Sequence, residues 1–109
     1  PIGAIYNTHH GTTNAVCMPA VLQFNKPAIQ CIMVQAANYL SLSGGFDGFC
    51  AYVDNLNNSL GIPKKLSGLV LKQIDIERIV AGALIDPSAG GNPIKMTQDY
   101  TTRLLLEII

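Results

Sequence analysis

The sequence predicts an all-α fold, and three observations support this prediction. Apolar residues recur at intervals of three and four through most of the chain, which is the spacing of one helix face. No segment has the pattern of a strand. The breaks between the periodic segments are short, so neighbouring helices are expected to pack antiparallel or at moderate angles, as a multi-helix bundle.

The expected elements begin with a loop over residues 1–11. A first helix is expected from Thr12 or Thr13 to about residue 24, because threonine is a competent N-cap. Pro19 lies inside this helix, where it should kink or end it. Residues 25–27 are expected to break the chain, because Pro27 suits the first turn of a second helix. The five helices are predicted at about 12–24, 28–40, 46–60, 75–85 and 98–107.

The later boundaries follow from glycine, proline and threonine. Residues 41–45 end the second helix, and Gly61 with Pro63 ends the third. Residues 64–72 are a connection, and residues 86–93 are a loop before the last helix, which Thr97 caps. The predicted apolar faces, helix by helix, are Val16, Pro19, Ala20 and Gln23; Ile32, Gln35, Ala36 and Tyr39; Phe49, Val53, Leu56 and Leu60; Ile76, Ile79, Val80 and Ala83; and Tyr100, Leu104 and Leu105.

Length and composition limit the number of domains and the kinds of partner that the protein can have. A chain of 109 residues has room for one domain. Seven basic and seven acidic residues leave no formal net charge, which argues against a nucleic-acid partner. Only 13% of residues are charged and 49% are apolar, so part of the surface is expected to be covered. The apolar run at residues 79–85 is far shorter than the roughly 20 residues that span a bilayer, so no membrane partner is expected.

The cysteines and the first residues of the chain indicate the cellular compartment of the protein. Cys17, Cys31 and Cys50 are odd in number and match no metal or redox spacing. We expect three buried, reduced thiols in a cytoplasmic protein. The start of the chain lacks the basic and apolar regions of a signal peptide. Pro1 either follows a removed methionine or marks a cut from something longer.

The residues that carry chemistry do not form a complete site. His9 and His10 are adjacent, and two neighbours rarely converge on one metal ion, so a solvent-facing or capping role is favoured from the residues alone. The glycines of residues 86–93 suggest a phosphate cradle, but neither a lysine nor a preceding strand accompanies them, which favours a plain loop. The residues that carry chemistry in this chain are therefore expected to form one part of a larger site.

The motifs are similar to those of a known family. Residues 1–4 fit P-x-G-A, and His10, Gly11, Asn14 and Ala15 fit the H-G-x-x-N-A of P-H-G-x-x-N-A, which precedes an apolar helix with a proline. This signature resembles that of the iron-containing (group III) alcohol dehydrogenases. Phe24-Asn25, Leu60-Gly61-Ile62-Pro63, the loop at 86–93 and the helix start at Thr97 agree with it, so the resemblance covers essentially the whole chain.

The resemblance implies a fold and a site. Residues 1–109 would be a fragment of the C-terminal helical metal-binding domain of a two-domain dehydrogenase, without its nucleotide-binding domain and upstream helices. The family's metal is Fe²⁺ or, in some branches, Zn²⁺, held by one Asp and three His. His10 corresponds to the last of these ligands, whereas His9 stands where the family usually has proline. Ser88 corresponds to a position that lines the substrate and nicotinamide pocket in some members, with loop capping as its plainer role.

The resemblance also implies an activity. The full protein would transfer a hydride between an alcohol and NAD(P)⁺, with the metal as Lewis acid, while this fragment alone would bind neither cofactor tightly and would be inactive. The implied partners are the missing N-terminal part, a small alcohol or aldehyde and, as in many members, a second copy in a homodimer. The alternatives are a non-catalytic helical interaction module derived from the family, or a particular member chemistry such as lactaldehyde, glycerol, butanol or maleylacetate conversion.

Overall fold

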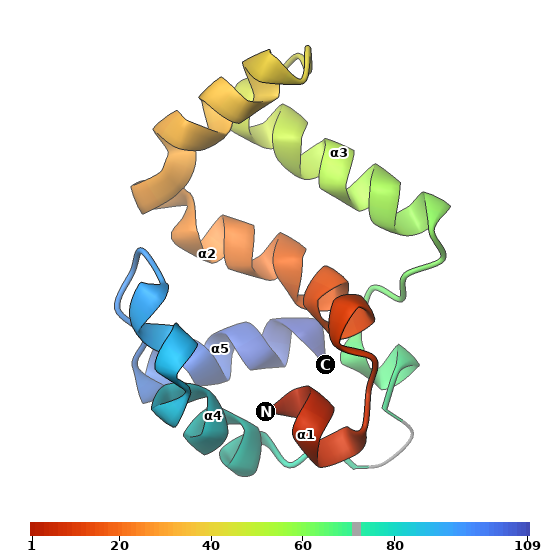
Figure 1. The fold of residues 1–109 in the computed structure, drawn as a ribbon, viewed down its shortest axis with the longest axis vertical. Helices are drawn as coiled ribbons and strands as arrows, with labels where there is room; N and C mark the ends of the chain where they lie inside the picture. The colour runs from red at the N-terminus through yellow and green to blue at the C-terminus, as the bar shows by residue number, and fades with distance from the viewer. Residues whose placement is uncertain (71–72) are drawn as a thin grey trace.

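The computed structural model describes residues 1–70 and 73–109, and in these ranges every regular element is a helix. Figure 1 shows two helical layers joined by α2, with both termini on the same side of the molecule. The elements in chain order are α1 (Ile2–Tyr6), α2 (His10–Tyr39), α3 (Gly45–Ser59), the short 3₁₀ turn η1 (Leu66–Gly68), α4 (Ile76–Ile85), the 3₁₀ turn η2 (Pro87–Gly91) and α5 (Gln98–Ile108). The predicted all-α class is confirmed.

Helix α2 corrects the prediction of two helices separated at residues 25–27. It is one helix of 30 residues that contains Pro19 and Pro27, and the ribbon changes direction sharply near its middle (Figure 1). A proline removes one helical hydrogen bond and bends a helix without always ending it. The Ala15 carbonyl, which Pro19 cannot reach, accepts a hydrogen bond from Asn57 Nδ2 at 2.9 Å instead. Contact with α3 therefore compensates for the first proline.

Two apolar clusters pack along α2. The first cluster joins the first half of α2 to η1, α4 and α5; its buried members are Val16, Leu66, Ile79, Val80, Leu105 and Ile108. The second joins the middle of α2 to α3, and its buried members are Leu22, Phe46 and Val53. The exposed Lys26–Asp47 ion pair, at 3.1 Å, also links α2 to α3.

The starts of the last two α-helices agree with the sequence. The Asp75 side chain accepts from the backbone N–H of Arg78 at 3.0 Å, and Thr97 Oγ1 accepts from the N–H of Tyr100 at 3.2 Å. The third predicted helix ends as expected, because Gly61 has a φ of 68° and the N–H of Ile62 bonds to the Asn57 carbonyl at 2.9 Å. Gly48 is also required, since a Cβ there would lie 1.8 Å from the Ser43 carbonyl oxygen.

Other expectations were wrong in detail. Residues 2–6 form α1 and residues 87–91 form η2, where loops were expected. The predicted stripe on the second half of α2 is not its buried face: Tyr39 is 89% and Ile32 60% exposed, whereas Ala37 is fully buried. Leu60 is 66% exposed. Cys31 is exposed rather than buried, and Cys17 and Cys50 are half-buried; all three thiols are free.

The predicted connection over 64–72 contains η1, and its last two residues lie outside the described residues. Within the described ranges, no helix combines the length and the apolar character needed to cross a bilayer.

Candidate functional site

His10 is the first residue of α2, and its side chain is exposed. Its Nε2 lies 3.0 Å from Asn14 Nδ2, one turn along the helix, where the amide donates and the ring nitrogen accepts. A metal ion would use the same lone pair of Nε2. Ligation through this atom therefore requires the exposed Asn14 side chain to turn away.

His9 is placed differently from its neighbour. It is the N-cap of α2, and its Nδ1 accepts from the backbone N–H of Thr12 at 3.4 Å and lies 3.3 Å from Thr12 Oγ1. Thr13 Oγ1 also donates to the His9 carbonyl at 2.9 Å. His9 thus caps the start of α2, whereas the exposed His10 ring bonds to the Asn14 side chain.

The donor set for a metal is incomplete in the described part of the chain. No three His, Cys, Asp or Glu side chains come together there in a way that would hold a metal ion. A lone exposed imidazole fits the role of one ligand, because His is a common ligand of Fe and Zn. A stable site needs further protein ligands around the same ion.

Ser88 lies in η2 and is fixed by Asp86. Asp86 Oδ1 accepts from the backbone N–H of Ser88 at 2.9 Å and from its hydroxyl at 2.5 Å. These hydrogen bonds to the ionised carboxylate hold the pKa of Asp86 below its ordinary value. The Ser88 side chain is exposed and takes part in a local cap, so the capping role expected as its plainer alternative is present.

Ser88 also lines a shallow hollow of about 260 Å³ at the start of the chain. The hollow brings together residues from the N-terminus, α4, η2 and α5: Pro1, Ala83, Asp86, Ser88, Ala89, Asn92, Met96 and Thr101. Pro1 packs closely on α4 here, since a Cβ at Gly82 would lie 2.9 Å from Pro1 Cβ. His10 is not among the lining residues, so the structure does not join the two predicted site residues in one pocket.

Sequence reasoning missed an amide pair that links α2 to the loop after η2. Asn25 is 4% exposed. Its Nδ2 donates to Asn92 Oδ1 at 2.8 Å, and Asn92 Nδ2 donates back to Asn25 Oδ1 at 2.9 Å. The two residues are 67 positions apart, so helical spacing could not pair them. The only sequence signal was that both asparagines fall within the motifs noted above.

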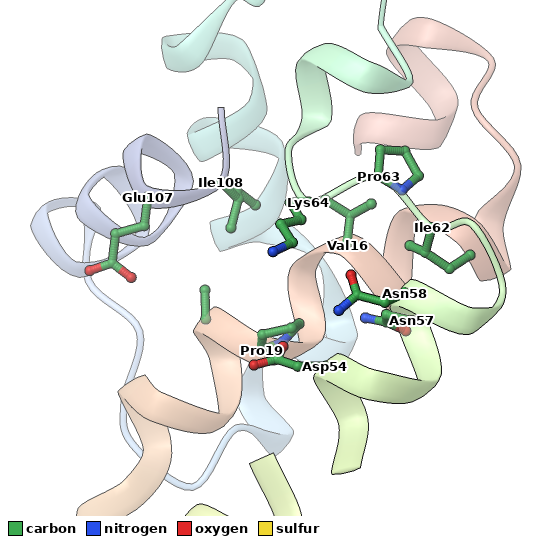
Figure 2. Close-up of a pocket in the computed structure, with 11 residues that line it drawn as sticks. Val16, Pro19, Asp54, Asn57, Asn58, Ile62, Pro63, Lys64, Glu107 and Ile108 are labelled. Carbon is green, nitrogen blue, oxygen red and sulfur yellow. The ribbon is translucent and has the colours of Figure 1, made fainter. Parts of the chain in front are cut away.

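A second cavity lies between α2, α3 and the C-terminal end of α5, with a volume of about 280 Å³. Figure 2 shows its mixed lining, with apolar side chains from α2 and polar ones from α3, among them Asn57 and Asp54. The Asn57 amide is committed to the Ala15 carbonyl. This cavity contains neither His10 nor Ser88.

Comparison with known proteins places the chain in a family. Residues 1–109 match the model of the family described as "Fe-containing alcohol dehydrogenase family, C-terminal". The chain is 33% identical to lactaldehyde reductase of Escherichia coli (strain K12) over 95% of its own length and 29% of that protein. It is 34% identical to 4-hydroxybutyrate dehydrogenase of Cupriavidus necator over 89% and 26% of the two chains, respectively.

A third relative, 1,3-propanediol dehydrogenase of Klebsiella pneumoniae, is 31% identical over 86% of this chain and 26% of its own. The chain thus spans less than a third of the length of the curated relatives it matches. Its helical architecture agrees with the all-α C-terminal domain that the family match implies. The protein described by these 109 residues belongs to the Fe-containing alcohol dehydrogenase family, whose C-terminal part it represents.

Proposed function

We propose that this chain is the metal-binding helical part of an NAD(P)-dependent alcohol dehydrogenase and that His10 is one of the ligands of its metal ion. The observation that carries the proposal is the family match over all 109 residues. It is supported by the position of His10, because the exposed ring at the first residue of α2 is accessible to groups brought by another part of the protein.

Two residues of this chain have roles in the proposed site, His10 and Ser88. His10 would hold Fe²⁺ or Zn²⁺ together with ligands from the rest of the protein, since a single imidazole does not retain either ion firmly. When bound, the metal would supply Lewis-acid polarisation of the alcohol oxygen. Ser88 would form part of the wall that orients the substrate and nicotinamide, held there by its two hydrogen bonds to Asp86.

The substrate class is proposed from the relatives. Their names specify lactaldehyde, 4-hydroxybutyrate and 1,3-propanediol. These are small aliphatic alcohols or aldehydes, as are the butanol and methanol that the names of two further relatives specify. We propose the same class for the full protein, with oxidation of the alcohol coupled to reduction of NAD⁺ or NADP⁺.

The adjacent histidines provide a matched pair of variants. We expect His10→Ala in the full-length protein to lower the bound Fe or Zn, measured by elemental mass spectrometry. The same variant should abolish NAD(P)H formation with 4-hydroxybutyrate and 1,3-propanediol and NAD(P)H consumption with lactaldehyde. His9→Ser keeps an N-cap side chain at the start of α2. It should retain both the metal and the activity.

Three results would contradict the proposal. Unchanged metal content in His10→Ala would remove His10 from the ligand set. Equal metal loss in both variants would show that the helix start, rather than the His10 ring, matters. A wild-type full-length protein without NAD(P)-dependent activity would favour the alternative of a non-catalytic interaction module.

A further inference from the structure

One amide pair makes the hydrogen bonds between the loop that carries Ser88 and α2. The other hydrogen bonds of this loop are local: Ser88 bonds to Asp86, Ala89 N–H to the Asp86 carbonyl at 3.0 Å, and Asn92 N–H to the Ala89 carbonyl at 3.2 Å. Among the described residues, the pair of Asn25 and Asn92 supplies the only hydrogen bonds from residues 86–94 to a distant element.

The Asn92 side chain is fully committed to this attachment. Its two N–H groups reach Asn25 Oδ1 at 2.9 Å and the Ile94 carbonyl at 2.6 Å, and its own oxygen accepts from Asn25 at 2.8 Å. Because the partner amide is 4% exposed, water cannot readily replace a lost bond. Removal of the Asn92 side chain therefore leaves the buried Asn25 amide without its partner, which is costly. Removal of the Asn25 side chain leaves the half-buried Asn92 amide with its local contacts to Ile94 and Met96.

Helix α2 is the element to which the loop is attached, and the same helix begins with His10. Asn25 lies on α2 three residues after Leu22 of the second apolar cluster and directly after Phe24, whose ring packs edge-on against Tyr100 of α5 at 5.4 Å between centroids. The attachment point is thus held from two sides. The amide pair is thus a hydrogen-bonded link between the loop after η2 and the helix that begins with His10.

We propose that Asn25 and Asn92 are positioning residues that place the Ser88 wall of the hollow relative to His10 and thereby set the affinity for substrate and nicotinamide. This inference rests on the proposed function, in which Ser88 lines the pocket and His10 binds the metal. Neither asparagine touches the reacting groups. Asn92 does line the hollow, so a shift of its backbone also displaces the wall.

The test uses the full-length, metal-loaded protein and the variants Asn25→Ala, Asn92→Ala and their combination. Each single variant loses both hydrogen bonds of the pair and should raise the KM for alcohol or for NAD(P)⁺ about tenfold, with unchanged metal content. The double variant should be no worse than either single one, because both remove the same interaction. Deuterium uptake should rise selectively in residues 86–96.

Asn57→Ala is the matched control. It also deletes an amide that bonds to α2, here at the Ala15 carbonyl, but on the α3 side and away from the hollow. It should lower the thermal midpoint while both KM values stay unchanged. If Asn92→Ala does not fold, Asn92→Gln keeps the donors and acceptor on a longer arm and should still raise KM.

The outcomes separate the two proposals. A fall in thermal midpoint with unchanged KM in Asn25→Ala and Asn92→Ala would show a purely structural pair and overturn the inference. Equal KM increases in Asn57→Ala would do the same. If the wild-type protein oxidises no alcohol, the proposed function fails. The attachment itself is then judged by deuterium uptake: a rise confined to residues 86–96 supports it, and a uniform rise refutes it.

Discussion

The hydrogen bond between Asn57 and α2 gives a quantitative prediction about how a helix accommodates a proline. Pro19 has no N–H, so it cannot bond to the carbonyl four residues earlier, that of Ala15. Asn57 Nδ2 fills this place at 2.9 Å. We therefore expect Asn57→Ala to destabilise the protein mainly because the half-buried Ala15 carbonyl loses its partner.

The size of the effect depends on the residue at position 19. With proline there, the loss of the Asn57 amide should cost about 1–3 kcal/mol, the range for an unsatisfied polar group. In a Pro19→Ala background, the new N–H of residue 19 can bond to the Ala15 carbonyl within the helix. The cost of Asn57→Ala should then fall, and a double-mutant cycle should give a coupling of about 1 kcal/mol.

Thermal unfolding of the full-length protein and its three variants measures these differences, and hydrogen exchange of the first half of α2 locates them. In Pro19→Ala, the N–H of residue 19 should exchange more slowly when the Asn57 side chain is removed, because the Ala15 carbonyl then has no competing donor. If Asn57→Ala lowers the free energy of unfolding equally with proline and with alanine at position 19, Asn57 does not compensate for the hydrogen bond that Pro19 lacks. The amide would then act only through its packing.

Three further outcomes are expected from single sites. Leu66 is fully buried in the first cluster, so Leu66→Ala should cost about 2–5 kcal/mol, seen as a lower thermal midpoint; a change below about 1 kcal/mol would contradict its role in the core. The pKa of Asp86 is lowered by the Ser88 hydrogen bonds, so its contribution to stability is present above the ordinary carboxyl pKa and is lost as the pH falls through the lowered value. Ser88→Ala should raise that pKa, as measured by carboxyl NMR titration, and no change would refute the cause. Cys31 is exposed, whereas burial raises the pKa of the Cys17 thiol; peptide mapping after alkylation should find Cys31 modified first, and the reverse order would contradict the arrangement.

The elements that the sequence predicted well are those whose ends carry local chemistry. Asp75 and Thr97 cap α4 and α5 through their own side chains, and Gly61 adopts the positive φ that ends α3. These signals act over a few residues. The break expected at Pro27 failed because the continuity of α2 depends on packing against α3 and α5, which local propensity does not contain.

The candidate site was predictable only in part for the same reason. His10 and Ser88 were identified from the family resemblance, and the structure adds that the first is exposed and the second bonded to Asp86. The pairing of Asn25 with Asn92 joins residues 67 positions apart. A single sequence contains no periodicity that links such distant positions, so this contact needed three-dimensional information.

The division of the apolar interior into two clusters has a consequence for variation in length. The α2–α3 hairpin has its own cluster around Leu22, Phe46 and Val53, while the first cluster joins only the first half of α2 to η1, α4 and α5. The connection at residues 40–44 lies at the far tip of this hairpin (Figure 1). Added turns of helix on both arms would extend the hairpin outward without disturbing the region around His10. We therefore expect this tip, rather than the junctions near α4 and α5, to tolerate insertions.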